Sequence, residues 1–228
     1  MGPVRAVLCD LDGTLLDTLG DIAQAANGVL QSLGFPPHPV QDYRRFVGEG
    51  VQVLFSRALP AGTGDPDRLA LCVARFREEY ARCWDVHTRP YDGIPELLTG
   101  LEERGLALAI LSNKPVDFVR MYVARYLSCW TFRVVLGQGE GNPRKPDPAG
   151  ALRTTAELGL ASSEIVYLGD SPVDVQTAHA AGMYAVGAGW GFRPVEELRQ
   201  AGADATIAHP RELLPILDAR RPEREHLC

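Results

Sequence analysis

Two carboxylates, Asp10 and Asp12, stand two positions apart near the start of the chain, and Gly13 and Thr14 follow them. They come directly after residues 4–9, a nearly all-apolar run without helical periodicity, which predicts a fully buried parallel strand. Open α/β sheets bind their ligands beyond the carboxyl ends of such strands. Two acidic side chains placed there repel each other and lose hydration unless a cation or a reaction requires them. The function is therefore expected at this strand end.

Three interpretations fit the segment Asp10-Leu11-Asp12-Gly13. The first is an acidic turn after a strand, because Asp and Gly favour turns. The second is a calcium loop of the EF-hand type, which needs glycine at its sixth position and a helix in front, whereas here glycine is fourth and a strand precedes. The third is a nucleophilic Asp10 with Asp12 as its acid/base neighbour and a bound Mg²⁺. Only the third requires partners elsewhere in the chain.

Candidate phosphate-binding groups follow the next two predicted strands. Ser112 and Asn113 offer a hydroxyl and an amide beside backbone N–H groups at a helix start, which suits an anion such as phosphate. Lys145 lies on a loop stiffened by Pro146 and Pro148, where it can hold a fixed charge near a phosphoryl group. Taken singly, these residues also fit an ordinary helix cap and a solvated surface lysine.

A second acidic strand end is predicted at Asp170. Carboxylates there suit a metal that prefers oxygen ligands. Asp174 lies four residues further on, so it can return over the first helical turn to orient Lys145 or a metal-bound water; a plain N-cap aspartate is the alternative. Jointly, the four groups occur in order at the carboxyl ends of successive parallel strands. Such ends face one crevice, where these side chains are expected to meet.

The elements that must position these groups alternate between strand and helix, with one long exception. Helices are predicted at 21–33, from an apolar stripe of 3.6-residue period, and then at roughly 40–47, 51–59 and 65–84. Nothing in 19–84 has the pattern of a strand. This segment is therefore predicted to be an inserted all-α module.

The alternation resumes after residue 91. We expect strands at 106–111, 133–136, 165–168, 184–187 and 205–208, and helices at 94–104, 115–127, 148–158, 172–181, 194–201 and 210–219. Repeated strand–helix units imply a parallel sheet with right-handed crossovers and helices on both faces. The predicted fold class is α/β, a doubly wound parallel sheet with a Rossmann-like core and the helical insertion.

Composition limits the partners. The net charge is −6 and no run of five basic residues occurs, so neither nucleic acid nor an anionic membrane is an expected partner. No apolar stretch approaches the roughly 18 residues of a membrane span, and the first strand leaves no room for a signal peptide. The five cysteines form no C-x-x-C pair, so zinc and a disulfide framework are not expected. A cytoplasmic location is predicted.

At these motifs the chain resembles the haloacid dehalogenase-like hydrolase superfamily. The resemblance rests on Asp10-Leu11-Asp12-Gly13-Thr14, Ser112, Lys145 and Gly169-Asp170 with Asp174. It implies that the insertion is a small α-helical cap. The expected domains are a core of residues 1–17 and 89–220, a cap of residues 18–88, and a charged, frayed tail at 221–228.

Within that superfamily the chain is most similar to phosphoglycolate phosphatases. The similarity is carried by Asp17–Asp21, Phe46–Gly50, Pro90–Gly93, Ser112–Pro115, Lys145–Pro148 and Gly189–Gly191. Gly20 stands where a proline is common, and Glu49 stands in a cap loop where a neutral or basic residue is usual. A carboxylate in a loop expected to meet a small acidic substrate argues against phosphoglycolate itself.

The resemblance implies roles for these residues. Asp10 attacks phosphorus and forms an aspartyl-phosphate, while Asp12 protonates the leaving oxygen and later activates water. The ligands of Mg²⁺ are Asp10, the main-chain carbonyl of Asp12, and Asp170. Phosphate is bound by Ser112, Asn113 and Lys145, Asp174 supports them from behind, and the cap loop Gly48, Glu49 and Gly50 reads the alcohol portion.

Several alternatives remain open for the activity. A sugar- or amino-sugar-phosphate phosphatase or a phosphomutase fits the same motifs. A phosphonate hydrolase would want a cap lysine, and residues 19–84 contain none. Asp12 favours phosphoryl transfer over dehalogenation, which has no leaving oxygen to protonate. A receiver-like phospho-aspartate switch is disfavoured by Asp12 and by the insertion. The expected partner is a small phosphomonoester, and the expected state a monomer or homodimer.

Overall fold

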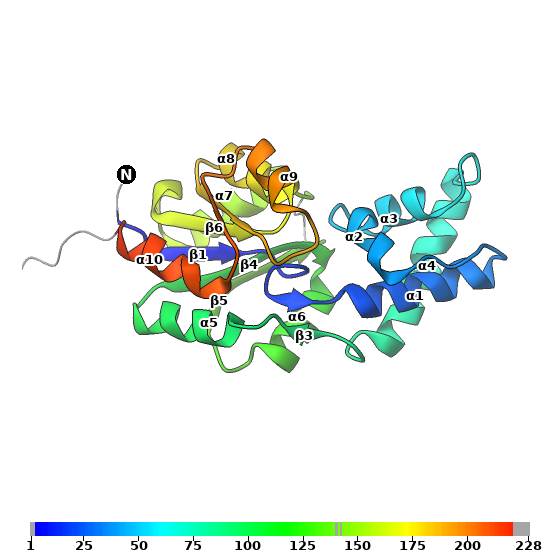
Figure 1. The fold of residues 1–228 in the computed structure, drawn as a ribbon, viewed down its shortest axis with the longest axis horizontal. Coiled ribbons are helices and arrows are strands. Elements are labelled where there is room, and N and C mark those ends of the chain that lie inside the picture. Colours follow the sequence, from blue (N-terminus) through cyan, green and yellow to red (C-terminus); the bar gives the residue numbers. More distant parts are fainter. Residues whose placement is uncertain (1–2, 140, 142, 221–228) are drawn as a thin grey trace, which may run out of the picture.

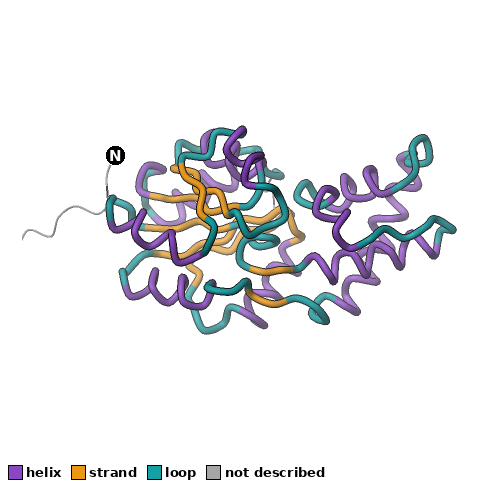
Figure 2. Tube along the Cα trace, viewed as in Figure 1, coloured by secondary structure: helices purple, strands orange, loops and turns teal. Residues whose placement is uncertain are grey.

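A computed structural model describes residues 3–139, 141 and 143–220; the predicted tail at 221–228 lies outside them. Its centre is a six-stranded parallel sheet of order β5-β4-β1-β6-β7-β8 (Figure 2). The strands are β1 (Ala6–Cys9), β4 (Ala107–Pro115), β5 (Phe132–Gln138), β6 (Ile165–Gly169), β7 (Tyr184–Ala188) and β8 (Ala205–Ile207). The apolar run before Asp10 thus forms a central strand, paired on both sides and fully buried.

Helices cover both faces of this sheet (Figure 1). Val7 and Cys9 pack with the helices of one face, and Ala6 and Leu8 with those of the other, because successive strand residues point to opposite sides. One face holds α5 (Ile94–Glu103), α6 (Val116–Tyr126) and α10 (Leu213–Asp218), and the other α7 (Ala149–Leu158), α8 (Pro172–Ala180) and α9 (Val195–Gln200); short 3₁₀ turns are Ser162–Glu164 and Pro210–Glu212. The predicted fold class, a doubly wound α/β sheet, is confirmed.

Strand β4 is longer than its apolar core predicts. It was expected at 106–111 but continues through Ser112, Asn113 and Lys114 to Pro115. The extension arises because β5 runs alongside β4 and pairs with it to its end. Leu111 is paired with Leu136, and Pro115 is paired with Gln138 after a register shift. The expectation that Ser112 and Asn113 stand at a helix start is therefore wrong, since α6 begins only at Val116 and no side chain caps it.

The helical insertion lies beyond the carboxyl ends of the sheet strands (Figure 1). It consists of α1 (Leu19–Ser32), a 3₁₀ turn (Val40–Asp42), α2 (Tyr43–Phe46), α3 (Val51–Ala58) and α4 (Pro66–Cys83). We call residues 18–88, with these helices, the cap. The helix expected at 40–47 is thus a 3₁₀ turn and a single α-turn. Among the described residues, no helix has both the length and the apolar character needed to cross a membrane.

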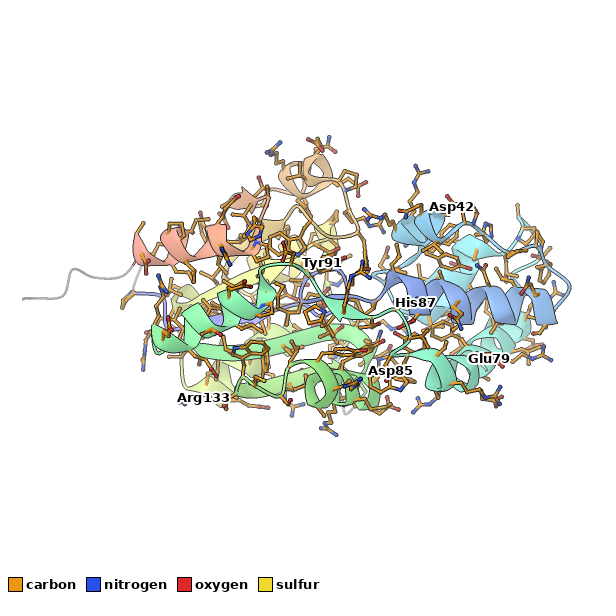
Figure 3. All side chains as sticks on the ribbon, turned by 60° about the horizontal axis from the view of Figure 1, so that its bottom comes forward. Asp42, Glu79, Asp85, His87, Tyr91 and Arg133 are labelled. Atoms are coloured by element: carbon orange, nitrogen blue, oxygen red, sulfur yellow. The ribbon has the colours of Figure 1, made fainter. Side chains whose placement is uncertain are left out.

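A two-stranded antiparallel ribbon, which the sequence patterns did not predict, joins the cap to the sheet. It pairs β2 (Leu16–Asp17) with β3 (Arg89–Pro90). Asp21, buried in the first turn of α1, accepts hydrogen bonds from the main-chain N–H groups of His87 (2.7 Å) and Thr88 (3.0 Å). Figure 3 shows His87 beside α1 at this junction. The two connections are consequently held side by side.

Candidate active site

The site is built at the carboxyl edge of the sheet, where β1 and β6 are neighbours. Asp10 follows β1 and Asp170 follows β6, so the backbone alone brings them together. Asp174 comes from the first turn of α8, and all three carboxylates have oxygen atoms within 4.8 Å of one another. The structure thus gathers three of the predicted aspartates into one buried cluster.

Lys145 bridges two of these carboxylates. Its Nζ lies 2.8 Å from Asp10 Oδ1 and 2.6 Å from Asp174 Oδ1. Asp174 is itself fixed by a capping box, in which Ser171 N–H donates to its Oδ2 at 3.1 Å. Lys145 is 5 % exposed, so it is neither a solvated surface lysine nor free to turn away. Its ammonium is a fixed positive charge beside Asp10.

Burial controls the protonation of these groups. It raises the pKa of Asp10 to about 7 against the opposing charge of Lys145, and the negative charge of Asp174 adds to the rise. The pKa of Asp170 is also raised, by burial first and then by Asp174 and Asp10. Burial disfavours the charged form of Lys145 too, but Asp10 and Asp174 outweigh it and hold its pKa above the ordinary value. With all three carboxylates ionised, the cluster would carry more negative charge than one lysine balances.

The surroundings of Asp170 fit a small cation. Asp170 accepts hydrogen bonds from Phe192 N–H (2.7 Å) and the Thr14 hydroxyl (3.2 Å), which fix its direction. Gly13 and Gly191 pass so close that a Cβ on either would meet Asp170 atoms at 2.3 and 2.2 Å. Asp10 Oδ1 is buried and receives no aligned hydrogen bond from the described residues, although Lys145 Nζ lies nearby. A tight set of under-neutralised carboxylate oxygens is the donor set that Mg²⁺ prefers.

Asp12 is placed differently from the cluster. Its carboxylate accepts two hydrogen bonds from Lys114 Nζ, at 2.9 and 3.1 Å, and one from the Thr18 hydroxyl at 2.7 Å. Its side chain therefore faces the start of the cap, while Asp10 faces Lys145. That Asp12 binds a metal through its main-chain carbonyl stays a prediction.

Ser112 and Asn113 lie on the β4 extension and hydrogen-bond to the main chains of Lys114 and Lys145. Asn113 Oδ1 accepts from Lys145 N–H at 2.8 Å, and its Nδ2 donates to the main-chain carbonyls of Lys145 (3.2 Å) and Gly48 (3.0 Å). Ser112 Oγ accepts from Lys114 N–H at 3.2 Å. Both side chains are buried. Asn113 thus ties the Lys145 loop, the sheet and the cap together.

The cap loop 48–50 contributes its glycines, and not the charge of Glu49, to the lining of the cavity. Gly48 and Gly50 line the cavity between cap and sheet, whereas Glu49 forms an ion pair with Arg57 of α3. The cap supplies apolar side chains to the lining, such as Val47, Val51, Leu54, Val73 and Phe76. The charged and polar lining residues are Asp10, Asp12, Arg77, Ser112, Asn113, Lys114, Lys145, Asp170, Ser171 and Arg193. The carboxylate of Glu49 is therefore balanced within the cap and is not part of the lining.

Sequence reasoning passed over Lys114 and Thr18, which hold Asp12. In the sequence, Lys114 stands within the segment Ser112–Pro115, one of those that carry the similarity to phosphoglycolate phosphatases. A usable signal was present: Lys114 and Lys145 are the only lysines of the chain, in which arginine is far more frequent. A residue type used only twice, each time beside candidate phosphate ligands, points to a local role. That both are buried could not be deduced, because lysine is usually exposed.

Comparisons with known proteins agree with this geometry. Residues 7–188 match the model of the haloacid dehalogenase-like hydrolase family. The chain is 32 % identical over 220 residues to the N-acetylmuramic acid 6-phosphate phosphatase of Pseudomonas aeruginosa, covering 94 % of this chain and 95 % of that protein. It is 35 % identical over 215 residues to the phosphoglycolate phosphatase of Pseudomonas putida, covering 92 % and 79 %.

The fold has a near match among solved structures. A Lactobacillus delbrueckii subsp. bulgaricus protein predicted to be a phosphoglycolate phosphatase superposes with a TM-score of 0.90 at 30 % identity, covering 94 % of this chain and 98 % of that one. The family model spans most of the sheet and the whole cap, including Asp10, Asp12, Lys145 and Asp170. The chain therefore belongs to the haloacid dehalogenase-like hydrolases.

Proposed function

We infer that the protein is a Mg²⁺-dependent phosphatase that hydrolyses a small phosphomonoester bearing a carboxylate, such as phosphoglycolate. The observation that carries this is the position of Asp10: a buried carboxylate at the end of β1, 2.8 Å from Lys145 and lining the cavity under the cap. A carboxylate so placed can attack a phosphorus atom whose charge its neighbours neutralise.

The reaction has two steps. An Asp10 oxygen bonds to phosphorus as the bond from phosphorus to the alcohol oxygen breaks, and Asp12 gives that oxygen a proton. Asp12 then takes a proton from water, whose oxygen bonds to phosphorus and releases phosphate and the free Asp10 carboxylate. Proton transfer of this kind contributes about 10²–10⁴-fold. The slowest phosphomonoester hydrolyses demand roughly 10²¹-fold, so positioning and charge neutralisation must supply most of the rate.

The remaining residues supply that neutralisation. Lys145 places its ammonium beside Asp10, where the phosphoryl oxygens would lie. The Ser112 hydroxyl and the main-chain N–H of Asn113 complete the phosphate site, since the Asn113 side-chain amide donates to the carbonyls of Lys145 and Gly48. Mg²⁺, held by Asp10, Asp170 and the Asp12 carbonyl, would reduce the repulsion between an anionic nucleophile and an anionic phosphate. Asp174 keeps Lys145 directed at Asp10.

The cavity wall bears on the substrate. Glu49 is neutralised by Arg57, so the residue that argued against an acidic substrate does not oppose one. Arg77 and Arg193 both line the cavity, and Arg77 is ion-paired with Asp117. Arg193 donates hydrogen bonds to the main-chain carbonyls of Arg45 and Val47, so it is the better candidate cation for a substrate carboxylate. The named substrates of the Pseudomonas relatives, phosphoglycolate and N-acetylmuramic acid 6-phosphate, are both carboxylic acids with a phosphate. The larger amino-sugar acid is the second candidate, because the apolar cap wall can contact the methyl groups of its N-acetyl and lactyl arms.

A substrate panel tests both candidates. Phosphate release is measured with and without Mg²⁺ on phosphoglycolate, N-acetylmuramic acid 6-phosphate, N-acetylglucosamine 6-phosphate and glucose 6-phosphate. We expect Mg²⁺-dependent release, highest on one of the two acids. Because N-acetylglucosamine 6-phosphate lacks only the acid arm, equal rates on the two amino sugars would contradict the carboxylate requirement. Asp10→Asn should lower turnover by about 10³-fold or more while keeping the fold; wild-type rates would require another nucleophile.

A further inference from the structure

Each of the two aspartates of the Asp10-Leu11-Asp12 segment has its own buried lysine. Lys145 pairs with Asp10, and Lys114 pairs with Asp12 through both carboxylate oxygens, at 2.9 and 3.1 Å. The Lys114 side chain is 6 % exposed. Lysine is almost never buried so far unless a partner compensates its charge. The only two lysines of the chain are thus divided between the two carboxylates.

Two aromatic rings hold the Lys114 ammonium from its other sides. Nζ lies 4.8 Å from the ring centre of Tyr80 and 4.9 Å from that of Tyr122, within the range of cation–π attraction. The two hydroxyl groups are 2.5 Å apart, so the rings brace each other. Tyr80 belongs to α4 of the cap and Tyr122 to α6 of the core. The ammonium therefore sits where cap and core meet.

Lys114 is fixed at its backbone as well. It lies on the extension of β4, and its N–H donates to Ser112 Oγ. With the main chain set by the sheet and the ammonium set by two rings, the side chain has little freedom to reorient. The fixed position of the Lys114 ammonium sets the direction of the Asp12 carboxylate, because Lys114 contacts both carboxylate oxygens and Thr18 contacts only one.

We propose that Lys114 is a positioning residue that aims the Asp12 carboxylate at the leaving oxygen of the substrate, with Tyr80 and Tyr122 as its supports. This rests on the proposed function, in which Asp12 transfers a proton to the alcohol oxygen as its bond to phosphorus breaks. Lys114 keeps its own protons throughout. If the Asp12 carboxyl group is wrongly oriented, the reaction rate should fall most for substrates whose leaving oxygen depends on receiving a proton.

Leaving groups separate this role from a merely structural one. An alkoxide is a poor leaving group without a proton, whereas p-nitrophenolate is a stable anion. The value of kcat/KM reports the step in which the leaving group departs. We therefore expect Lys114→Met to lower kcat/KM by about 10–100-fold on the best alkyl ester of the substrate panel, and by no more than about threefold on p-nitrophenyl phosphate.

Three further variants sharpen the comparison. Asp12→Asn should show the same selectivity with a larger loss. Lys145→Met, the other buried lysine, should lower both rates to a similar degree, because it contacts the nucleophile. Lys114→Arg keeps a cation that can stack on aromatic rings and should recover part of the alkyl-ester rate that Lys114→Met loses. Tyr80→Leu leaves both ion-paired residues in place and should give a smaller selective loss.

The geometry can be observed directly because only two lysines exist. With lysine labelled by ¹³C at Cε, two side-chain signals are expected, and ring currents should move the Lys114 protons upfield. Tyr80→Leu removes one of the two rings, so it should reduce that shift and leave the Lys145 signal unchanged. Equal losses on both esters for Lys114→Met and Tyr80→Leu, with Asp12→Asn still selective, would overturn the positioning role alone. A non-selective Asp12→Asn would overturn the acid role in the proposed function, and this inference with it.

Discussion

The side-chain amide of Asn113, on the sheet, donates a hydrogen bond of 3.0 Å to the main-chain carbonyl of Gly48, on the cap. The same amide group, through its two atoms, also holds Lys145 at both its N–H and its carbonyl. A residue expected to bind phosphate is thus in contact with the loop expected to read the rest of the substrate. The Asn113 side chain therefore both holds the cap against the sheet and fixes the main chain of Lys145.

Replacing Asn113 by Ala should therefore impair activity and stability together. Three hydrogen bonds are lost, one of them to the cap, and buried partners are left unsatisfied, so the free energy of unfolding should fall by about 1–3 kcal/mol. We expect kcat/KM to fall by about tenfold or more, because Lys145 loses the support of its backbone. Urea unfolding and steady-state kinetics measure the two effects.

Asn27→Ala is the matched control. Asn27 makes three comparable hydrogen bonds inside the cap, to His38 N–H (2.8 Å), His38 carbonyl (2.9 Å) and the Tyr43 hydroxyl (2.8 Å). Its loss of stability should be similar, while kcat/KM at a temperature well below unfolding stays near that of the wild type. If Asn27→Ala impairs kcat/KM as much as Asn113→Ala does, general weakening of the cap explains both.

Stability of the metal-free protein should depend on the charge of Asp10. Burial raises its pKa in the folded state from 3.8 to about 7, so between these values the folded chain holds a proton that the unfolded chain has released. The free energy of unfolding then declines as pH rises from about 4 to about 7, through this group. Asp170, whose pKa is also raised, acts in the same direction.

Urea unfolding in EDTA at pH 4.5 and pH 7.5 measures this dependence. Asp10→Asn cannot ionise, so its stability should decline less across the interval than that of the wild type. Mg²⁺ should raise the wild-type melting temperature at pH 7.5, because a ligand that binds only the folded state stabilises it. Asp170→Asn should largely lose that Mg²⁺ effect. Identical pH profiles for Asp10→Asn and the wild type would mean that the buried carboxylate is fully ionised at pH 4.5.

Two glycines with the same backbone conformation should respond differently to alanine. Gly13 has φ +85° and Gly34 has φ +79°, so either substitution strains the backbone by about 1 kcal/mol. At Gly34 no atom lies within 4 Å of the added carbon, whereas at Gly13 the Asp170 carboxylate lies at 2.3 Å. Gly13→Ala should therefore be less stable than Gly34→Ala and should lose most of its activity, as thermal melts and phosphate-release assays would reveal. Equal activity in both variants would indicate that Asp170 moves aside without cost.

The order of elements was predictable because each apolar run is short and each helix carries its own stripe. The end of β4 was not, since Ser112, Asn113 and Lys114 have no strand-like alternation and are extended only because β5 pairs beside them. The ribbon of β2 and β3 could not be predicted for a similar reason. Each of its strands has only two residues, too few to show a periodicity, and the two strands are far apart in the chain.

The candidate site shows the same division. That Asp10, Lys145 and Asp170 meet follows from parallel topology, which brings strand ends to one edge. The partner of Glu49 could not be foreseen, because its ion pair with Arg57 depends on how the cap loop meets α3. The pairing of Lys114 with Asp12 depends on the burial and the direction of both side chains, and the spacing of residues in the sequence predicts neither.

The ribbon of Leu16–Asp17 with Arg89–Pro90 holds the two connections between the insertion and the core side by side. The chain leaves the core and returns to it across a single narrow span, so no hydrogen bond between the six core strands would have to break if another module replaced the helices. Chimeras joined at these four residues should therefore keep the six-stranded sheet intact while acquiring a new choice of substrate. Full activity would also require the new module to supply what Thr18 and Tyr80 give now, a hydroxyl for Asp12 and an aromatic ring for Lys114.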